Sequence, residues 1–164
     1  MRATLLLVLT ALAAPARAEP PAQLAGLRFL LGSWDAASDG SGASGAFTFA
    51  PGVQDQVIVR TNYSNSPAAD GRPASRHDDL MIIYVEEGQV RAEYFDNEGH
   101  VIRYVAEVRP GEVLFTSEVR ANEPRYRLAY RLLAGGALEG RFDVAPPGRP
   151  DGFAQYLTWT AKRR

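Results

Sequence analysis

Short segments of alternating apolar and polar residues follow one another from about residue 33 to the end of the chain. They are rich in Val, Ile, Tyr, Phe and Thr, and turn residues bound each of them. No helical period separates them, so the pattern predicts an all-β fold, an up-and-down antiparallel barrel of about ten strands. The expected strands are 33–38, 45–50, 53–63, 79–85, 89–96, 100–109, 112–120, 125–133, 137–144 and 153–161.

One short helix is expected before the first strand. The apolar residues of this segment lie close together, and Gly32 ends it: Leu24, Leu27, Phe29, Leu30 and Leu31. Glycine is a common residue just after a helix. Trp34 begins the first strand directly after this segment, and Trp159 lies near the end of the last strand. We expect the helix and the two tryptophans to plug one end of the barrel.

Turn chemistry predicts the pairing of the strands. Pro110-Gly111 is a two-residue connection that places Val108 opposite Val113. Three triplets ending in glycine suit three-residue loops, in which the glycine takes a left-handed conformation. This reading pairs Tyr84 with Val90 around Glu86–Gly88, Asp96 with His100 around Asn97–Gly99, and Leu132 with Leu138 around Ala134–Gly136.

These registers give one continuous apolar face and one charged face, as a closed barrel needs. The tight turns Pro51-Gly52, Glu86–Gly88, Pro110-Gly111 and Ala134–Gly136 fall at the plugged end. The turn Asn97–Gly99 and the long loops fall at the other end and form a mouth. The long connections are 39–45, 64–78, 121–124 and 146–152. The residues expected to face inward include Leu80, Ile82, Tyr84, Val90, Ala92, Tyr94, His100, Ile102, Tyr104, Ala106, Val108, Val113, Phe115, Ser117, Val119, Tyr126, Leu128, Tyr130, Leu132, Leu138, Phe142, Val144, Phe153, Leu157 and Trp159.

Composition narrows the class of protein. The 164 residues include no cysteine, which excludes disulfides and thiolate metal sites. The formal net charge of −1 argues against a nucleic-acid partner. Arg2, an apolar run and the small-x-small pattern Ala16-Arg17-Ala18 predict a signal peptide at 1–18. We therefore expect one domain at 19–164, periplasmic or secreted, with no membrane span in the mature chain.

The segment Phe29-Leu30-Leu31-Gly32-Ser33-Trp34, a Gly-x-Trp after a short helix and before an all-β meander, resembles the calycin superfamily. It is closest in style to the nitrobindin-like and lipocalin-like proteins of bacteria. The resemblance implies a barrel closed below by the tryptophan, with a small, largely apolar ligand inside. Haem-binding nitrobindins use a late histidine as iron ligand. This sequence has no histidine after His100, so we expect neither haem nor another cofactor.

Several tyrosines on the expected inward face favour an interior of some polarity, because each buried phenol needs a hydrogen-bond partner. The alternative is that their hydroxyls reach solvent at the barrel ends. Arg60 and Asn62 lie on a strand whose inward face the pattern does not decide, and they remain ligand candidates. The expected ligand-binding residues are Tyr84, Tyr94, Asp96, His100, Tyr104 and Tyr130, with Tyr126 also facing inward.

Asp96 and His100 carry the one candidate for acid–base chemistry. A carboxylate opposite an imidazole fixes its tautomer, as catalysis requires, but it also steadies a hairpin. His77 and Asp79 could join them in a metal site of two histidines and carboxylates, or all four could form a solvated polar rim. The sequence thus predicts a barrel that binds a small hydrophobic or amphipathic molecule. A small hydrolase or isomerase using Asp96 and His100, or a ligand-free scaffold barrel, is the alternative.

Overall fold

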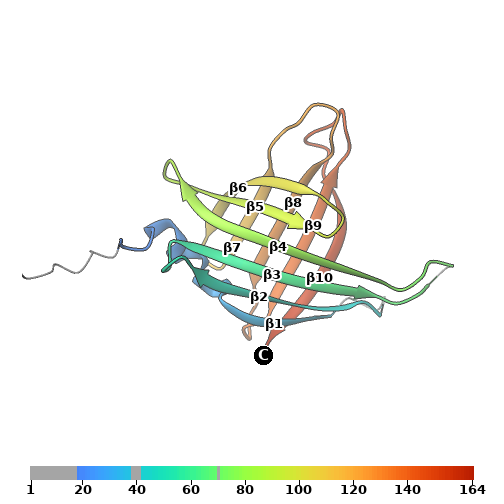
Figure 1. The fold of residues 1–164 in the computed structure, drawn as a ribbon, viewed down its shortest axis with the longest axis horizontal. Coiled ribbons are helices and arrows are strands. Elements are labelled where there is room, and N and C mark those ends of the chain that lie inside the picture. The colour runs from blue at the N-terminus through green and yellow to red at the C-terminus, as the bar shows by residue number, and fades with distance from the viewer. Residues whose placement is uncertain (1–17, 38–41, 70) are drawn as a thin grey trace, which may run out of the picture.

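A closed antiparallel β-barrel forms the body of the protein in the computed structural model (Figure 1), which describes residues 18–37, 42–69 and 71–164. The predicted leader therefore lies outside the described residues, apart from Ala18. One 3-10 helix precedes ten strands, and the predicted fold class is confirmed. The elements are η1 (Ala22–Leu30), β1 (Gly32–Ala37), β2 (Ser44–Gly52), β3 (Val57–Ser66), β4 (Ser75–Glu86), β5 (Gln89–Asp96), β6 (Val101–Arg109), β7 (Glu112–Ser117), β8 (Arg125–Leu132), β9 (Leu138–Ala145) and β10 (Ala154–Arg163).

Each strand pairs with the next one along the chain, and β1 pairs with β10 to close the barrel. The closing seam is short: its register runs over four pairs, from Trp34 opposite Arg163 to Ala37 opposite Thr160. In Figure 1, β2 to β5 run across the view, and β8 to β10 run steeply behind them. Among the described residues, no helix is long and apolar enough to cross a membrane.

The helix η1 closes one end of the barrel. Its Leu24, Leu27 and Leu30 are buried, and the helix contacts β4, β5 and β6. The indole N–H of Trp34, which is fully buried, donates to the Leu30 carbonyl oxygen at 2.8 Å. The Arg163 guanidinium lies 4.4 Å from the centre of the Trp34 ring. The floor of the barrel thus consists of the helix η1, the Trp34 indole bonded to its last residue, and the Arg163 guanidinium over the indole ring.

The turn between β4 and β5 differs from the prediction. It has two residues, Glu87 and Gly88, both with positive φ (51° and 78°), and Val85 pairs with Val90. Such a turn matches the right-handed twist of the strands that it joins. A change of one residue in register reverses every side chain of a strand. Leu80, Ile82 and Tyr84 therefore face outward, and Met81 and Ile83 are the buried residues of β4.

Two other connections are placed differently from the prediction. The turn after β2 is Val53–Gln56 rather than Pro51-Gly52, with φ of 49° at Val53, 55° at Gln54 and 69° at Asp55. The predicted loop 64–78 is mostly strand, because β3 and β4 stay paired out to Ser66 and Ser75. This hairpin projects well beyond the barrel (Figure 1).

Phe153 was expected inside the barrel and lies outside it. The register of β10 against β9 shifts between Gln155 and Leu157, so the side chains before this bulge point the other way. The Phe153 ring packs 3.9 Å from the guanidinium carbon of Arg127, a residue of the outer face of β8. Val119 and Leu132, also expected inside, are 64% and 40% exposed, because β7 ends at Ser117 and Leu132 is the last residue of β8.

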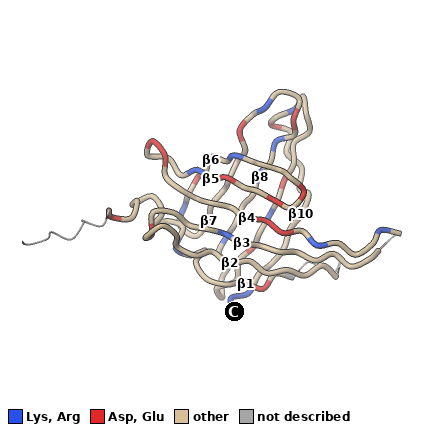
Figure 2. The backbone as a smooth tube through the Cα atoms, viewed as in Figure 1, with Lys and Arg blue, Asp and Glu red and all other residues tan. Residues whose placement is uncertain are grey.

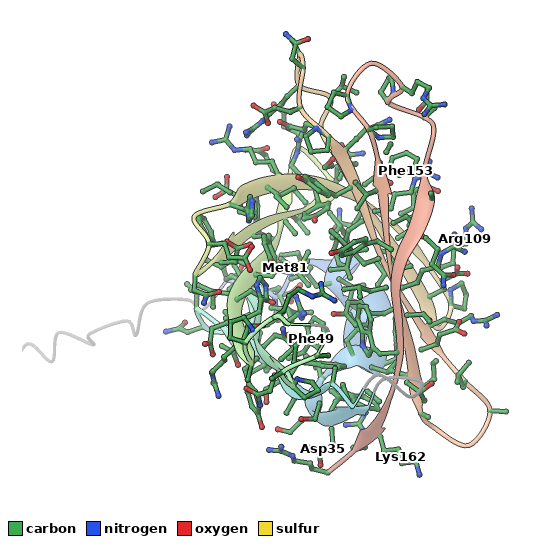
Figure 3. The ribbon with its side chains drawn as sticks, turned by 90° about the vertical axis from the view of Figure 1, so that its right-hand side faces the viewer. Asp35, Phe49, Met81, Arg109, Phe153 and Lys162 are labelled. Carbon is green, nitrogen blue, oxygen red and sulfur yellow. The ribbon has the colours of Figure 1, made fainter. Side chains whose placement is uncertain are left out.

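Large side chains fill the half of the barrel next to the helix. The almost fully buried side chains there include Phe47, Phe49, Phe115 and Tyr130. In Figure 3, Phe49 and Met81 lie inside the barrel and Arg109 lies outside it. Basic and acidic residues are interspersed along the described chain rather than gathered in one region (Figure 2). The candidate site therefore lies between this packed floor and the long loops at the mouth.

Candidate functional site

A buried ion pair lies on the inner wall formed by β3 and β4. The Arg60 guanidinium contacts the Asp79 carboxylate at 3.0 Å, and their side chains are 6% and 3% exposed. The Asn62 amide donates to the other Asp79 oxygen at 2.7 Å. Arg60 and Asn62 are two residues apart on β3, and their side chains therefore share the inner face.

Arg60 reaches toward the centre of the barrel. Its guanidinium carbon lies 5.9 Å from the ring centres of both Phe47 and Tyr130. Burial disfavours its charged form, but the surrounding charges outweigh burial, and Asp79 helps to hold the pKa of Arg60 above its usual value. Its Nε atom is buried and has no hydrogen-bond partner.

Tyr130 carries a second unpartnered polar atom. Its hydroxyl is buried beside the Arg60 guanidinium, but no well-directed hydrogen bond joins it to that group or to another. Burial raises the pKa of Tyr130 to about 12, against the opposing effect of the nearby Arg60 guanidinium, so the phenol is neutral at ordinary pH. Buried polar groups without partners are uncommon and call for an explanation such as a bound water, ion or ligand. Four such atoms occur among the described residues: Arg60 Nε and the Tyr130 hydroxyl in the interior, and Nε of Arg91 and of Arg127 on the outer face.

A chain of hydrogen bonds leads from this ion pair to the mouth. The His77 Nδ1 atom donates to Glu98 at 3.1 Å, and its Nε2 atom lies 2.9 Å from the Tyr94 hydroxyl. His77 Nε2 is also 3.5 Å from the nearer Asp79 oxygen. The Tyr94 hydroxyl donates to Asp96 at 3.2 Å. Burial first, and then the Asp79 and Asp96 carboxylates, raise the pKa of Tyr94 far above its usual value.

The predicted Asp96–His100 contact is present. His100 Nδ1 donates to Asp96 Oδ2 at 2.9 Å, around the three-residue turn that the sequence predicts. The other oxygen, Oδ1, accepts the backbone N–H groups of Glu98 at 3.0 Å and of His100 at 2.9 Å. Burial acts against the Asp96 carboxylate, but these hydrogen bonds outweigh it and lower its pKa. The carboxylate therefore has a clear structural role in holding the turn.

Apolar side chains line the rest of the mouth half. Ile102 lies opposite Tyr94 across β5 and β6, and the rings of Tyr126 and Phe142 stack at 5.8 Å. Tyr104 is 2% exposed and packs edge to face on Phe115, and burial raises its pKa. A small, partly open space of about 20 Å³, enough for about one water molecule, lies at the ends of β6 and β7; its lining includes Ile102 and Tyr126 but also the charged Arg103, Glu118, Arg120 and Glu123.

A larger hollow, of about 480 Å³, lies outside the barrel beside the projecting β3–β4 hairpin. It is wide open, and its one charged lining residue, Arg76, is already bound to Asp78 and stacked on Tyr63. The hollow is therefore separate from the polar chain and adds no further chemistry to it.

The structure brings most of the predicted site residues together. Tyr94, Asp96, His100 and His77 form one hydrogen-bonded network, Asp79 lies 3.5 Å from His77, and Tyr104 and Tyr130 face the interior. Tyr84 does not join them, because it lies on the outer face among residues such as Arg91 and Glu93.

The sequence predicts Arg60 only as a ligand candidate and does not decide whether its side chain faces the interior. The apolar run Val57-Ile58-Val59 before Arg60 does not decide its direction, because alternate residues of the run are apolar on either face.

No group of three or more His, Cys, Asp or Glu side chains in the described part of the chain is arranged to hold a metal ion. His77 and His100 instead each direct a ring nitrogen at a carboxylate. Of the four residues of the alternative metal site, Asp96 and His100 pair with each other, whereas His77 bonds to Glu98 and Tyr94, and Asp79 to Arg60 and Asn62.

Comparison with known proteins adds no family assignment. No protein-family profile matches the chain, and a search of curated proteins returns no match.

Proposed function

We propose that this protein binds a small hydrophobic or amphipathic molecule in the mouth half of its barrel. The observation that carries the proposal is that two polar atoms in the barrel interior, Arg60 Nε and the Tyr130 hydroxyl, are buried without hydrogen-bond partners. Leaving such groups without partners costs about 1–3 kcal/mol each, which a bound polar group would offset. The ligand enters from the long-loop end, and the half-buried side chains of Ile102, Tyr126 and Phe142 move aside to admit it.

A calycin-like barrel is part of the same proposal. The closed barrel with a helix and Trp34 at one end is compatible with that superfamily, and its Gly-x-Trp segment begins the first strand. Its members commonly hold apolar ligands inside, which supports a binding function. We also propose that the protein acts in the periplasm or outside the cell, because of the apolar leader at 1–18. The N-terminal sequence of protein recovered from the periplasm tests this, with Glu19 expected as the first residue.

Titration with N-phenyl-1-naphthylamine, a neutral dye that fluoresces in apolar surroundings, tests the binding function. We expect saturable binding at one site in the wild-type protein. Ile102→Asp puts a charge on the inner wall and should weaken binding at least about tenfold. Leu80→Asp, on the outer face of β4, is the control and should leave binding unchanged.

The absence of saturable binding in folded wild-type protein would refute the proposal and favour the scaffold barrel. Equal loss in both variants would place the dye outside the interior. Circular dichroism of each variant shows whether the barrel is intact, so that a folding defect is not read as a binding defect.

A small barrel enzyme using Asp96 and His100 is the second candidate, favoured by the 2.9 Å contact that orients the imidazole. His100→Gln separates the two functions, because a binding protein keeps its affinity for the neutral dye in this variant. A hydrolase or an isomerase that uses this pair would instead lose turnover in the His100→Gln variant.

A further inference from the structure

We infer that the interior site selects amphipathic molecules whose head group is uncharged and accepts hydrogen bonds, such as an alcohol or an amide, over fatty acids. This inference rests on the proposed function and adds the chemical class of the ligand. It follows from the charges that already face the interior and from the atoms there that lack partners.

The buried arginine already has its counter-ion. Arg60 and Asp79 are in contact at 3.0 Å and are both almost fully buried, so the pair as a whole carries no net charge. A ligand carboxylate placed at Arg60 would also lie close to Asp79. Two like charges in a poorly solvated space repel each other strongly. The guanidinium therefore does not serve as a free anion receptor.

A second carboxylate, that of Asp96 on the neighbouring strand β5, strengthens this bias. Asp96 is 3% exposed on its side chain, and its lowered pKa keeps it ionised. The buried charges that face the site are thus two carboxylates and one guanidinium. The two histidines beside them are each directed at carboxylates: His77 at Asp79 and the exposed Glu98, and His100 at Asp96. Each of these basic groups, Arg60, His77 and His100, thus has an acidic neighbour.

The unpartnered atoms indicate what the ligand must offer. Arg60 Nε can only donate a hydrogen bond, and the Tyr130 hydroxyl can donate or accept one. A hydroxyl or carbonyl oxygen satisfies the arginine N–H and the phenol without bringing in a charge. An alkylammonium group has no acceptor for Arg60 and would bring a second cation next to the guanidinium. An uncharged acceptor is the head group that fits both conditions.

The experiment compares four ligands with the same alkyl chain by displacement of N-phenyl-1-naphthylamine: 1-decanol, decanamide, decanoate and decyltrimethylammonium. Each is used below its micelle concentration, at about pH 8, where decanoate is fully ionised. We expect decanol and decanamide to displace the dye at concentrations at least about tenfold lower than the two charged ligands. Decanoate binding as tightly as decanol, or tighter, would overturn the inference.

Asp79→Asn tests the cause of the selectivity. The variant removes the counter-ion of Arg60, so decanoate should gain relative to decanol by about tenfold or more. Asp78→Asn is the matched control, because Asp78 is half-exposed and pairs with Arg76 on the outer face; its ligand ratios should not change. If Asp79→Asn does not fold, the double variant Arg60→Met/Asp79→Leu replaces the pair with apolar groups and should lose the preference for decanol over decane. Retention of that preference would overturn the inference.

Failure of the proposed function gives a different result. In that case neither the dye nor any of the four ligands binds the wild-type protein saturably. Binding of the dye with a preference for decanoate would leave the proposed function intact and refute only the inference about the head group.

Discussion

Replacing Tyr130 by phenylalanine should make the protein more stable. The ring of Tyr130 packs edge to face on Phe49 at 5.4 Å and on Trp159 at 6.0 Å, and phenylalanine keeps these contacts without leaving a cavity. The change removes one hydroxyl that is buried without a hydrogen bond. Since the phenol is neutral at ordinary pH, no charge is lost with it.

The size of the effect follows from the cost of burying an unpaired hydroxyl. Removing it should raise the free energy of unfolding by about 1 kcal/mol, and the melting temperature by about 3 °C for a domain of this size. Urea unfolding followed by tryptophan fluorescence measures the change. Tyr126→Phe is the matched control, because that half-buried ring lies near the mouth; its stability should stay within about 0.5 kcal/mol of wild type.

A clear loss of stability in Tyr130→Phe, of about 1 kcal/mol or more, would refute the reasoning. It would mean that the hydroxyl is satisfied in solution, for example by an internal water molecule. The same variant should bind 1-decanol more weakly than wild type, because the ligand loses one hydrogen-bond partner. If Tyr130→Phe is more stable but binds 1-decanol more weakly than wild type, the Tyr130 hydroxyl serves binding at the expense of stability.

Two further predictions concern the floor and the mouth of the barrel. Trp34→Ala should lower the free energy of unfolding by about 3–5 kcal/mol, because it removes a fully buried indole and its hydrogen bond to Leu30; an unchanged urea midpoint would contradict this. Asp96→Asn should cost about 1–2 kcal/mol at neutral pH, since the amide nitrogen cannot accept from Tyr94 and His100. The pKa of Asp96 is lowered by folding, so its contribution is fully present above the unfolded value of about 3.9 and is lost as pH falls through the folded pKa. Stability of the variant should therefore fall less on acidification than that of wild type, and parallel pH profiles would contradict the assignment.

The sequence predicted the fold because period-two alternation and turn residues are local signals. It also predicted the Asp96–His100 contact, since Gly99 closes the turn between them in the expected left-handed conformation (φ 88°). For the similar triplet Glu86–Gly88 the predicted three-residue turn was wrong. Glu87 adopts a positive φ, which is uncommon for glutamate and which the sequence does not indicate. Because the turn is one residue shorter than predicted, Tyr84 faces outward, and Met81 and Ile83 face the core instead.

The buried ion pair was harder to predict than the turns. The inward direction of Arg60 depends on the three left-handed residues from Val53 to Asp55, none of them a glycine. The inward direction of Asp79 depends on the turn at Glu87 and Gly88, on the other side of the same pair of strands. Two independent registers must both be right before these side chains meet. Local propensity determines neither, because tertiary pairing outweighs the preference of individual residues.

Because a short seam between β1 and β10 closes the barrel, the closed sheet depends on the residues of β10. Asp35 and Arg164, which pair across it, are 129 positions apart in the sequence. Contacts between such distant segments form late in folding, because the chain must first pay the entropy of closing the loop. A growing polypeptide therefore holds a sheet with two open edges until its final segment is available. A product that stops short of residue 154 would keep both edges, on β1 and on β9, and exposed edges of this kind pair with those of other molecules. Truncated chains of this protein should thus form aggregates rather than smaller soluble domains.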